Sequence, residues 1–227
     1  MHNYITPLVK LFGQNANAAN AKPMAKYMKN LFPYLGIKTP PRRELLKQFF
    51  KENGKPEITE LKQISRELWE LPEREFQYCA VSMLQLYKNK VDASFIELYE
   101  QFIITKSWWD TVDAVAANLI GSLFKKYPEM IKPHTEKWQA SGNMWLQRTA
   151  LLFQLNYKAE TNVKLMFDLI RCNLGSKEFF INKAIGWILR QYSKTDARAV
   201  IDFVEKTDLA SLSKREALKW LNNHSTT

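Results

Sequence analysis

The stretch KSWWDTVDAVAANLIGSL, residues 106–123, predicts a helix that starts near Trp108 and buries one face. Its apolar side chains recur at the spacing of a helix and form one stripe, made of Trp108, Val112, Val115, Leu119 and Leu123. At about 100° per residue, Trp109 and Asp113 lie roughly 85–125° from the centre of that stripe. We therefore expect an aromatic ring and a carboxylate to flank the core, one helical turn apart.

The same kind of helix returns along the chain at an interval of 35 residues. The equivalent positions, whose numbers differ by 35 each time, are Arg43, Tyr78, Asp113, Arg148 and Lys183. Two residues after them stand Leu45, Ala80, Val115, Ala150 and Ile185, and another helical stretch separates successive segments. A two-helix unit repeated at about 35–45 residues is typical of an α-solenoid, and the lack of the TPR Trp-Leu-Gly pattern favours HEAT-like repeats.

The composition agrees with an all-α protein. Hydrophobic residues make up 46% of the 227 residues, which is enough to bury a core and excludes a disordered chain. The chain has only 7 Gly and 9 Pro, too few for the many tight turns of a β-barrel or β-sandwich. We predict a single domain over residues 1–227, an α-solenoid curved so that one helix of each repeat lines a basic concave face.

Four short patterns predict where helices begin. Thr39-Pro40 and Leu71-Pro72 place proline at first-turn positions. Ser107-x-x-Asp110 and Ser213-x-x-Glu216 read as capping boxes.

The charge raises the prospect of a polyanionic partner. Lys and Arg number 33 against 23 Asp and Glu, a formal net charge of +10. Such an excess favours nucleic acid as a partner without setting the fold, and a basic protein without such a partner remains the alternative.

Several kinds of chemistry have no support in the sequence. Cys79 and Cys172 lie far apart in apolar surroundings and read as buried thiols, and with three scattered histidines they give no zinc spacing. There is no P-loop or G-x-G-x-x-G motif, no stretch near the ~20 apolar residues of a membrane span, and no signal-peptide pattern. We expect a cytoplasmic protein that uses carboxylates, cations and aromatic rings, with no metal and no membrane contact.

Asp113, Arg148 and Lys183 occupy equivalent repeat positions, so a solenoid would stack them into one stripe. Trp109 and Trp187 each lie one helical turn from a member of that stripe. Any one of these positions has an explanation without a function: a Trp can simply cover a neighbouring repeat, and an Asp can simply be solvated. The gathering of cations and two Trp around one carboxylate favours a functional site.

Longer blocks of the sequence resemble the bacterial AlkD family of DNA alkylation repair glycosylases. The resemblance covers essentially the whole chain and rests on these blocks: Pro23–Asn30 (PMAKYMKN), Leu71–Phe76 (LPEREF), Lys106–Asp113 (KSWWDTVD), Trp145–Arg148 (WLQR), Ser176–Trp187 (SKEFFINKAIGW) and Leu212–Ala217 (LSKREA). That family is described as a HEAT-like solenoid, in agreement with the repeat.

The resemblance implies excision of cationic N3- and N7-alkylated purines from duplex DNA, without a cofactor and without flipping the base into a deep pocket, unlike most enzymes that process bases. Alkylation at N3 or N7 makes the base cationic and weakens its glycosidic bond, so no general acid is needed. A carboxylate can stabilise the oxocarbenium-like sugar and orient water, and we assign this role to Asp113. Trp109 and Trp187 would pack on the deoxyribose and attract the cation.

Further residues would hold the DNA backbone. For Arg148, phosphate contact is preferred to bracing the carboxylate. Adjacent residues on a helix point in different directions, so one of Phe179 and Phe180 would belong to the core and the other would reach the groove. We assign Phe180 to contact with DNA. This chain departs from the family pattern at Asn156, a position after Arg148 where the family can carry a lysine. The remaining predicted contacts are Lys106, Arg43, Tyr27, Thr39, Lys183 and Arg190.

Two other functions stay open, a HEAT-like module that binds nucleic acid without chemistry and a scaffold for protein interactions. The leading hypothesis is a monomeric glycosylase acting on duplex DNA that contains alkylated purines.

Overall fold

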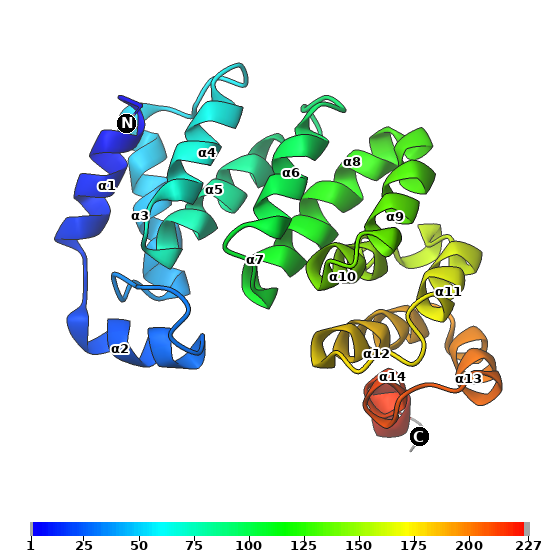
Figure 1. The fold of residues 1–227 in the computed structure, drawn as a ribbon. Helices are drawn as coiled ribbons and strands as arrows, with labels where there is room; N and C mark the ends of the chain where they lie inside the picture. The colour runs from blue at the N-terminus through cyan, green and yellow to red at the C-terminus, as the bar shows by residue number, and fades with distance from the viewer. Residues whose placement is uncertain (1, 225–227) are drawn as a thin grey trace. The chain divides into compact units, whose positions relative to one another are not determined.

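A computed structural model describes residues 2–224 of the chain. Within those residues the secondary structure is helical and contains no strand (Figure 1). The chain divides into two compact units, residues 1–91 and 92–227. The all-α prediction is confirmed; the HEAT-like solenoid, its basic concave face and the single domain remain predictions.

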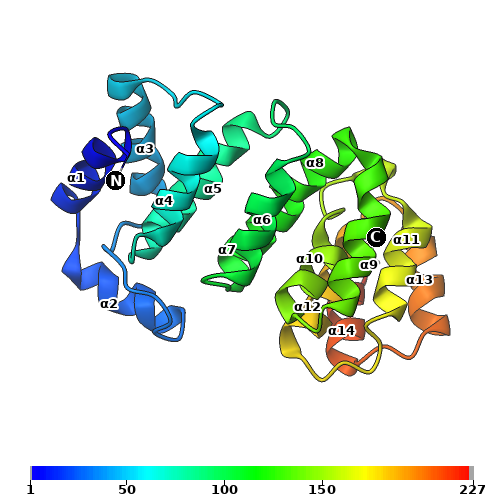
Figure 2. The ribbon, with the colours of Figure 1, turned by 45° about the horizontal axis from the view of Figure 1, so that its top comes forward.

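The first unit consists of α1 (Ile5–Gln14), α2 (Ala18–Tyr27), α3 (Thr39–Asn53), α4 (Leu61–Glu70) and α5 (Arg74–Tyr87). Helices α4 and α5 pack against each other, as both ribbon views show (Figure 2). The fully buried Glu75 accepts hydrogen bonds from the amides of Leu35, Gly36 and Ile37 at 2.9–3.1 Å. This carboxylate fixes the connection that leads into α3.

The second unit begins with α6 (Phe95–Ile104), α7 (Trp109–Ala114), a π-helical segment (Val115–Ile120) and α8 (Gly121–Lys126). It continues through α9 (Ile131–Ala140), α10 (Met144–Leu152), α11 (Val163–Arg171), α12 (Phe179–Ser193), α13 (Ala197–Lys206) and α14 (Ser211–His224). Two 3₁₀ turns, Pro128–Met130 and Lys158–Glu160, precede α9 and α11.

Every position of the 35-residue alignment lies in a helix. The helices are α3, α5, α7, α10 and α12, and at least one other helix separates each from the next. The residues two positions on are buried in four of the five cases, Leu45 being only half-buried. The 35-residue interval therefore marks helices in which the equivalent position, two residues after the aligned one, is buried in four of five cases.

The helix predicted from Trp108 begins at Trp109 and changes its winding partway along. Between α7 and α8 the backbone is π-helical, with i→i+5 pairing in place of i→i+4. The side chain of Asn156 donates to the carbonyl of Ala117 at 3.3 Å and to Oδ1 of Asn118 at 3.2 Å. A uniform 100° per residue misses this change of winding, which begins at Val115, two residues after Asp113.

Three of the four predicted helix starts are wrong. Thr39 does open α3 with proline in its first turn, but Pro72 precedes α5 rather than entering it. The hydroxyl of Ser107 donates to the carbonyl of Ile103, and that of Ser213 to the carbonyl of Asn182 on α12. Neither serine caps its own helix, because Ser107 bonds back to the last turn of α6 and Ser213 bonds across to α12.

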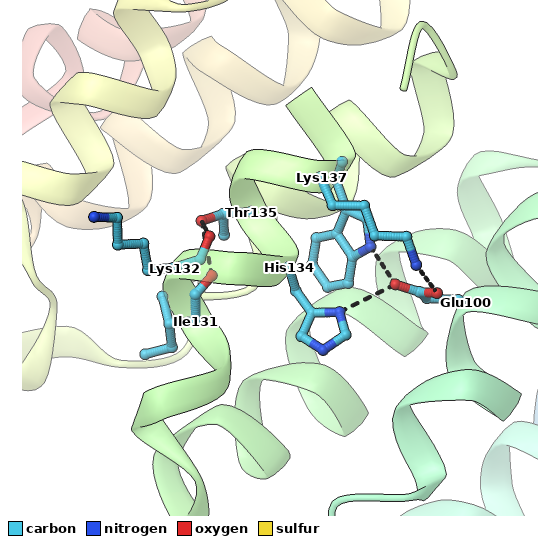
Figure 3. Close-up of polar contacts among 7 residues, drawn as sticks. Glu100, Ile131, Lys132, His134, Thr135 and Lys137 are labelled. Atoms are coloured by element: carbon cyan, nitrogen blue, oxygen red, sulfur yellow. Dashed lines mark hydrogen bonds and ion pairs between the residues drawn. The ribbon is translucent and has the colours of Figure 1, made fainter. Parts of the chain in front are cut away.

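A carboxylate joins α6 to α9. Glu100 accepts hydrogen bonds from Nζ of Lys137 at 2.7 Å and Nε1 of Trp138 at 2.6 Å, and lies 3.1 Å from Nδ1 of His134 (Figure 3). Burial alone would raise the pKa of Glu100, but the hydrogen bonds from Lys137, Trp138 and His134 together bring it below its ordinary value. The ionised carboxylate thus holds the two helices together.

The cysteines differ in environment. Cys79 is fully buried, as predicted, and burial raises its pKa to about 12. Cys172 is exposed at the end of α11, so the prediction of a second buried thiol is wrong. Among residues 2–224, no helix is both long and apolar enough to cross a membrane.

Helices α12 and α14 approach each other closely at Gly186. A Cβ atom at Gly186 would lie 2.4 Å from Cβ of Glu216 and 2.9 Å from the carbonyl oxygen of Ser213. Glycine is therefore required there, in the middle of a helix where its helix propensity is poor.

Gly186→Ala should destabilise the protein by about 1–3 kcal/mol, because the steric cost exceeds the gain of about 1 kcal/mol in helix propensity. Gly13→Ala is the matched control, since a Cβ at Gly13 in α1 would meet nothing within 4 Å. It should be neutral or stabilising by about 0.5–1 kcal/mol. Urea unfolding followed by circular dichroism measures both. Equal stabilisation by the two substitutions would contradict the close contact.

Candidate functional site

A pocket of about 390 Å³ lies in the second unit, between residues of α7, α10, α12 and α14. Its wall combines aromatic rings with charged groups of both signs. The lining residues are Trp109, Asp110, Asp113, Arg148, Phe179, Phe180, Lys183, Trp187, Arg190 and Glu216. Seven of them were predicted as site residues from the sequence.

Asp113 and Arg148 form a two-pronged ion pair in this wall. Nε of Arg148 donates to Oδ1 of Asp113 at 2.7 Å, and Nη2 donates to Oδ2 at 2.8 Å. The side chains are 12% and 5% exposed, and Nη1 of Arg148 also donates to the carbonyl of Phe180. In this structure Arg148 braces the carboxylate, which was the alternative to the preferred phosphate contact, and phosphate contact remains a prediction. Asp113 occupies one bidentate edge of the guanidinium, formed by Nε and Nη2.

Burial dominates the acid–base behaviour of Asp113. It raises the pKa of the carboxyl above its ordinary value, the Arg148 hydrogen bonds and charge lower it, and nearby Asp110 raises it further. The net result is a raised pKa. Asp113 is consequently a stronger base than an exposed aspartate, while the guanidinium keeps its two oxygens oriented.

Trp109 and Trp187 are both half-buried and line the pocket, so neither is a core residue. Trp109 is the first residue of α7, one turn before Asp113, and Trp187 lies in α12 next to Gly186. The expectation that Trp109 and Asp113 flank the core is confirmed. Asp113 is more enclosed than a flanking position suggests, because Arg148 covers it.

The two adjacent phenylalanines are divided as expected, one packed and one open. The Phe180 ring lies 5.1 Å from those of Trp108 and Trp145, whereas Phe179 is 58% exposed. Phe180 is half-buried and still lines the pocket, so its contact with DNA remains a prediction. Phe179, which also lines the pocket, is the more exposed of the two rings.

Lys183 and Arg190 reach the pocket from α12 and share one partner on α14. Nζ of Lys183 lies 3.0 Å from Oε1 of Glu216, and Nη1 of Arg190 lies 2.6 Å from Oε2. Both cations remain partly exposed, at 36% and 26%. Phosphate contact remains a prediction for each of them.

The other predicted contacts lie outside the pocket lining. Lys106 precedes α7 with a positive φ of 48°, a backbone conformation that is uncommon for lysine. Tyr27, 70% exposed, ends α2, and Thr39 and Arg43 occupy the first two turns of α3. These three belong to the first unit, where their role in DNA binding stays a prediction.

Sequence reasoning missed Asp110 and Glu216. Both belong to blocks that carry the family resemblance, but both were interpreted as halves of capping boxes. Among residues 2–224 there is no group of three or more His, Cys, Asp or Glu side chains placed to hold a metal ion.

The fold and the site define an all-α protein with a carboxylate-bearing pocket among aromatic rings and cations. The chain belongs to the family of DNA alkylation repair enzymes, whose model matches residues 8–221. A solved structure described as a predicted DNA alkylation repair enzyme from Enterococcus faecalis is 33% identical, with a TM-score of 0.83. The match covers 91% of this chain and 96% of that one. A comparison with curated proteins gave no match.

Arg148→Gln should destabilise the protein by about 3–5 kcal/mol, because it leaves Asp113 as a buried carboxylate without its guanidinium. Asp113→Asn combined with Arg148→Gln should recover part of that loss. Arg198→Gln is the control, since it breaks the exposed Arg198–Asp202 pair within α13 and should cost less than about 0.5 kcal/mol. Denaturant unfolding measures five proteins: wild type, Arg148→Gln, Asp113→Asn, the double variant and Arg198→Gln. Additive losses in the double variant would contradict the coupling.

Proposed function

We propose that this chain is a DNA glycosylase that excises cationic N3- and N7-alkylated purines from duplex DNA. Its family membership places it in the repair of alkylation damage, with DNA as the substrate. The observation that carries the finer proposal is the Asp113–Arg148 pair, which sets an oriented carboxylate into a pocket wall beside Trp109 and Trp187.

The chemistry requires little of the protein. A purine alkylated at N3 or N7 carries a positive charge, so its glycosidic bond breaks without protonation of the leaving base. The bond electrons leave with the base, the sugar becomes oxocarbenium-like, and a water molecule adds to its anomeric carbon and gives up a proton. Asp113 can stabilise the sugar cation and orient or deprotonate that water. Arg148 is a positioning residue, because it acts through the carboxylate.

The aromatic walls suit a cationic ligand. A cation that lies over an aromatic face gains about 0.5–2 kcal/mol, and Trp is the best of the rings for this contact. Trp109 and Trp187 would therefore pack on the deoxyribose and the charged nucleotide. The alkylated base would not be inserted into a deep pocket.

Duplex DNA would be the partner of the basic side chains. Lys183, Arg190 and Lys106, with Arg43, Tyr27 and Thr39 of the first unit, would contact the phosphate backbone without reading sequence. The protein would act in the cytoplasm as a monomer with HEAT-like repeats, without a metal or organic cofactor.

Wild-type protein should release free 7-methylguanine or 3-methyladenine from methylated duplex DNA, and Asp113→Asn should slow that release by about 10²–10³-fold. Affinity for the duplex should change by less than about threefold, because Asp113 faces the sugar rather than the phosphates. Single-turnover release and fluorescence anisotropy measure the two quantities. Asp208→Asn, at an exposed position, controls for the loss of one negative charge.

Equal losses of release and binding in Asp113→Asn would make Asp113 a structural residue. Binding without any release by wild type would favour the nucleic-acid-binding module, and salt-insensitive binding to an acidic protein, with no affinity for duplex DNA, would favour the scaffold.

The release rate should fall as the pH falls through the pKa of Asp113, since only the ionised carboxylate stabilises the sugar cation. The pKa is raised by burial, so this loss should begin above the ordinary aspartate value of about 3.9 and approach tenfold per pH unit. Single-turnover rates between neutral and acid pH, with the enzyme-free rate subtracted, test this. Asp113→Asn should remove the acid limb; an unchanged limb would assign it to another group.

A further inference from the structure

Glu216 binds two cations of the pocket at once. Its Oε1 accepts from Lys183 at 3.0 Å and its Oε2 from Arg190 at 2.6 Å, and its side chain is only 14% exposed. The hydrogen bond and charge of Lys183, followed by those of Arg190, bring the pKa of Glu216 below its ordinary value, so the group is ionised at neutral pH. One negative charge is thus shared between two positive ones.

The fold builds this arrangement through the close contact of α12 and α14. Lys183 and Arg190 are seven residues apart, on one face of α12, and Gly186 lies between them. Without a side chain there, α14 approaches until Cβ of Glu216 lies where a Cβ of residue 186 would collide with it. The hydroxyl of Ser213, one turn before Glu216, donates to the carbonyl of Asn182 at 2.9 Å and fixes the register.

The pairing sets the charge of the pocket. Its described lining contains the cations Arg148, Lys183 and Arg190 and the carboxylates Asp110, Asp113 and Glu216, so positive and negative groups are equal in number. The chain as a whole carries a net charge of +10. With Arg148 held by Asp113, Glu216 is the group that offsets the two cations of α12.

We propose that Glu216 is a specificity-determining residue: by pairing with Lys183 and Arg190 it allows a cationic nucleotide into the pocket and weakens binding to undamaged DNA. The inference rests on the proposed glycosylase function. Two unpaired cations beside the pocket would repel a positively charged base or sugar. The same two cations, once unpaired, would attract the phosphates of any duplex.

Glu216→Gln tests the proposal in the full-length protein. Affinity for an undamaged duplex at low salt should rise by roughly three- to tenfold, and the slope of log K against log salt should steepen by about 1 to 2, because Lys183 and Arg190 both become available to phosphate. Single-turnover release of 7-methylguanine should fall by at least about threefold, through repulsion of the cationic nucleotide. Glu205→Gln removes the same charge from an exposed position in α13 and should leave the slope and the release rate close to those of wild type.

An unchanged or weaker affinity of Glu216→Gln for undamaged DNA would overturn the proposal, as would an effect of equal size in Glu205→Gln. If Glu216→Gln does not fold, Glu216→Asp decides, since it keeps the charge but lengthens both ion pairs. Its affinity for undamaged DNA should rise in the same direction, and no change would overturn the proposal. Absence of base release by wild type would contradict the glycosylase function instead, because affinity for undamaged DNA is measured without catalysis.

Discussion

The site depends on the ion pair between Asp113 and Arg148. A carboxylate that is mostly shielded from water is costly to ionise, and a two-pronged guanidinium offsets much of that cost while it fixes both oxygens. The pair joins α7 to α10, and through the carbonyl of Phe180 it also reaches α12. Three of the four helices that line the pocket are therefore joined by the same interaction that orients its candidate catalytic group.

The pocket wall is organised as carboxylates paired with cations, set among aromatic rings. Asp113 forms an ion pair with Arg148, and Glu216 forms ion pairs with Lys183 and Arg190. The aromatic surface comes from Trp109, Trp187 and the exposed Phe179. Such a wall does not repel a cation, and the pairing with Glu216 weakens, without abolishing, the attraction of Lys183 and Arg190 for phosphate. The overall excess of positive charge is then left for other surfaces, where it can attract a polyanion.

The sequence was sufficient to predict the helices and much of the site, because both follow from spacing along single helices. The 35-residue interval placed Asp113, Arg148 and Lys183 at equivalent positions, and Trp109 follows from one turn of helix. What spacing does not determine is which side chains meet across helices. The partner of Arg148, the packing of the Phe180 ring against Trp145 and the reach of Glu216 to α12 all depend on tertiary packing, and the last requires Gly186. The π-helical turn after Asp113 has no signature in the apolar pattern.

The central claim is that Asp113 stabilises positive charge on the sugar. Its most direct test compares the affinities of two duplexes, one with a cationic pyrrolidine and one with a neutral tetrahydrofuran in place of the deoxyribose. Wild-type protein should prefer the cationic duplex by at least about tenfold, and Asp113→Asn should lose that preference while binding the neutral duplex as wild type does. An equal preference in both proteins would contradict the account, because the group that stabilises the cation would then be another one.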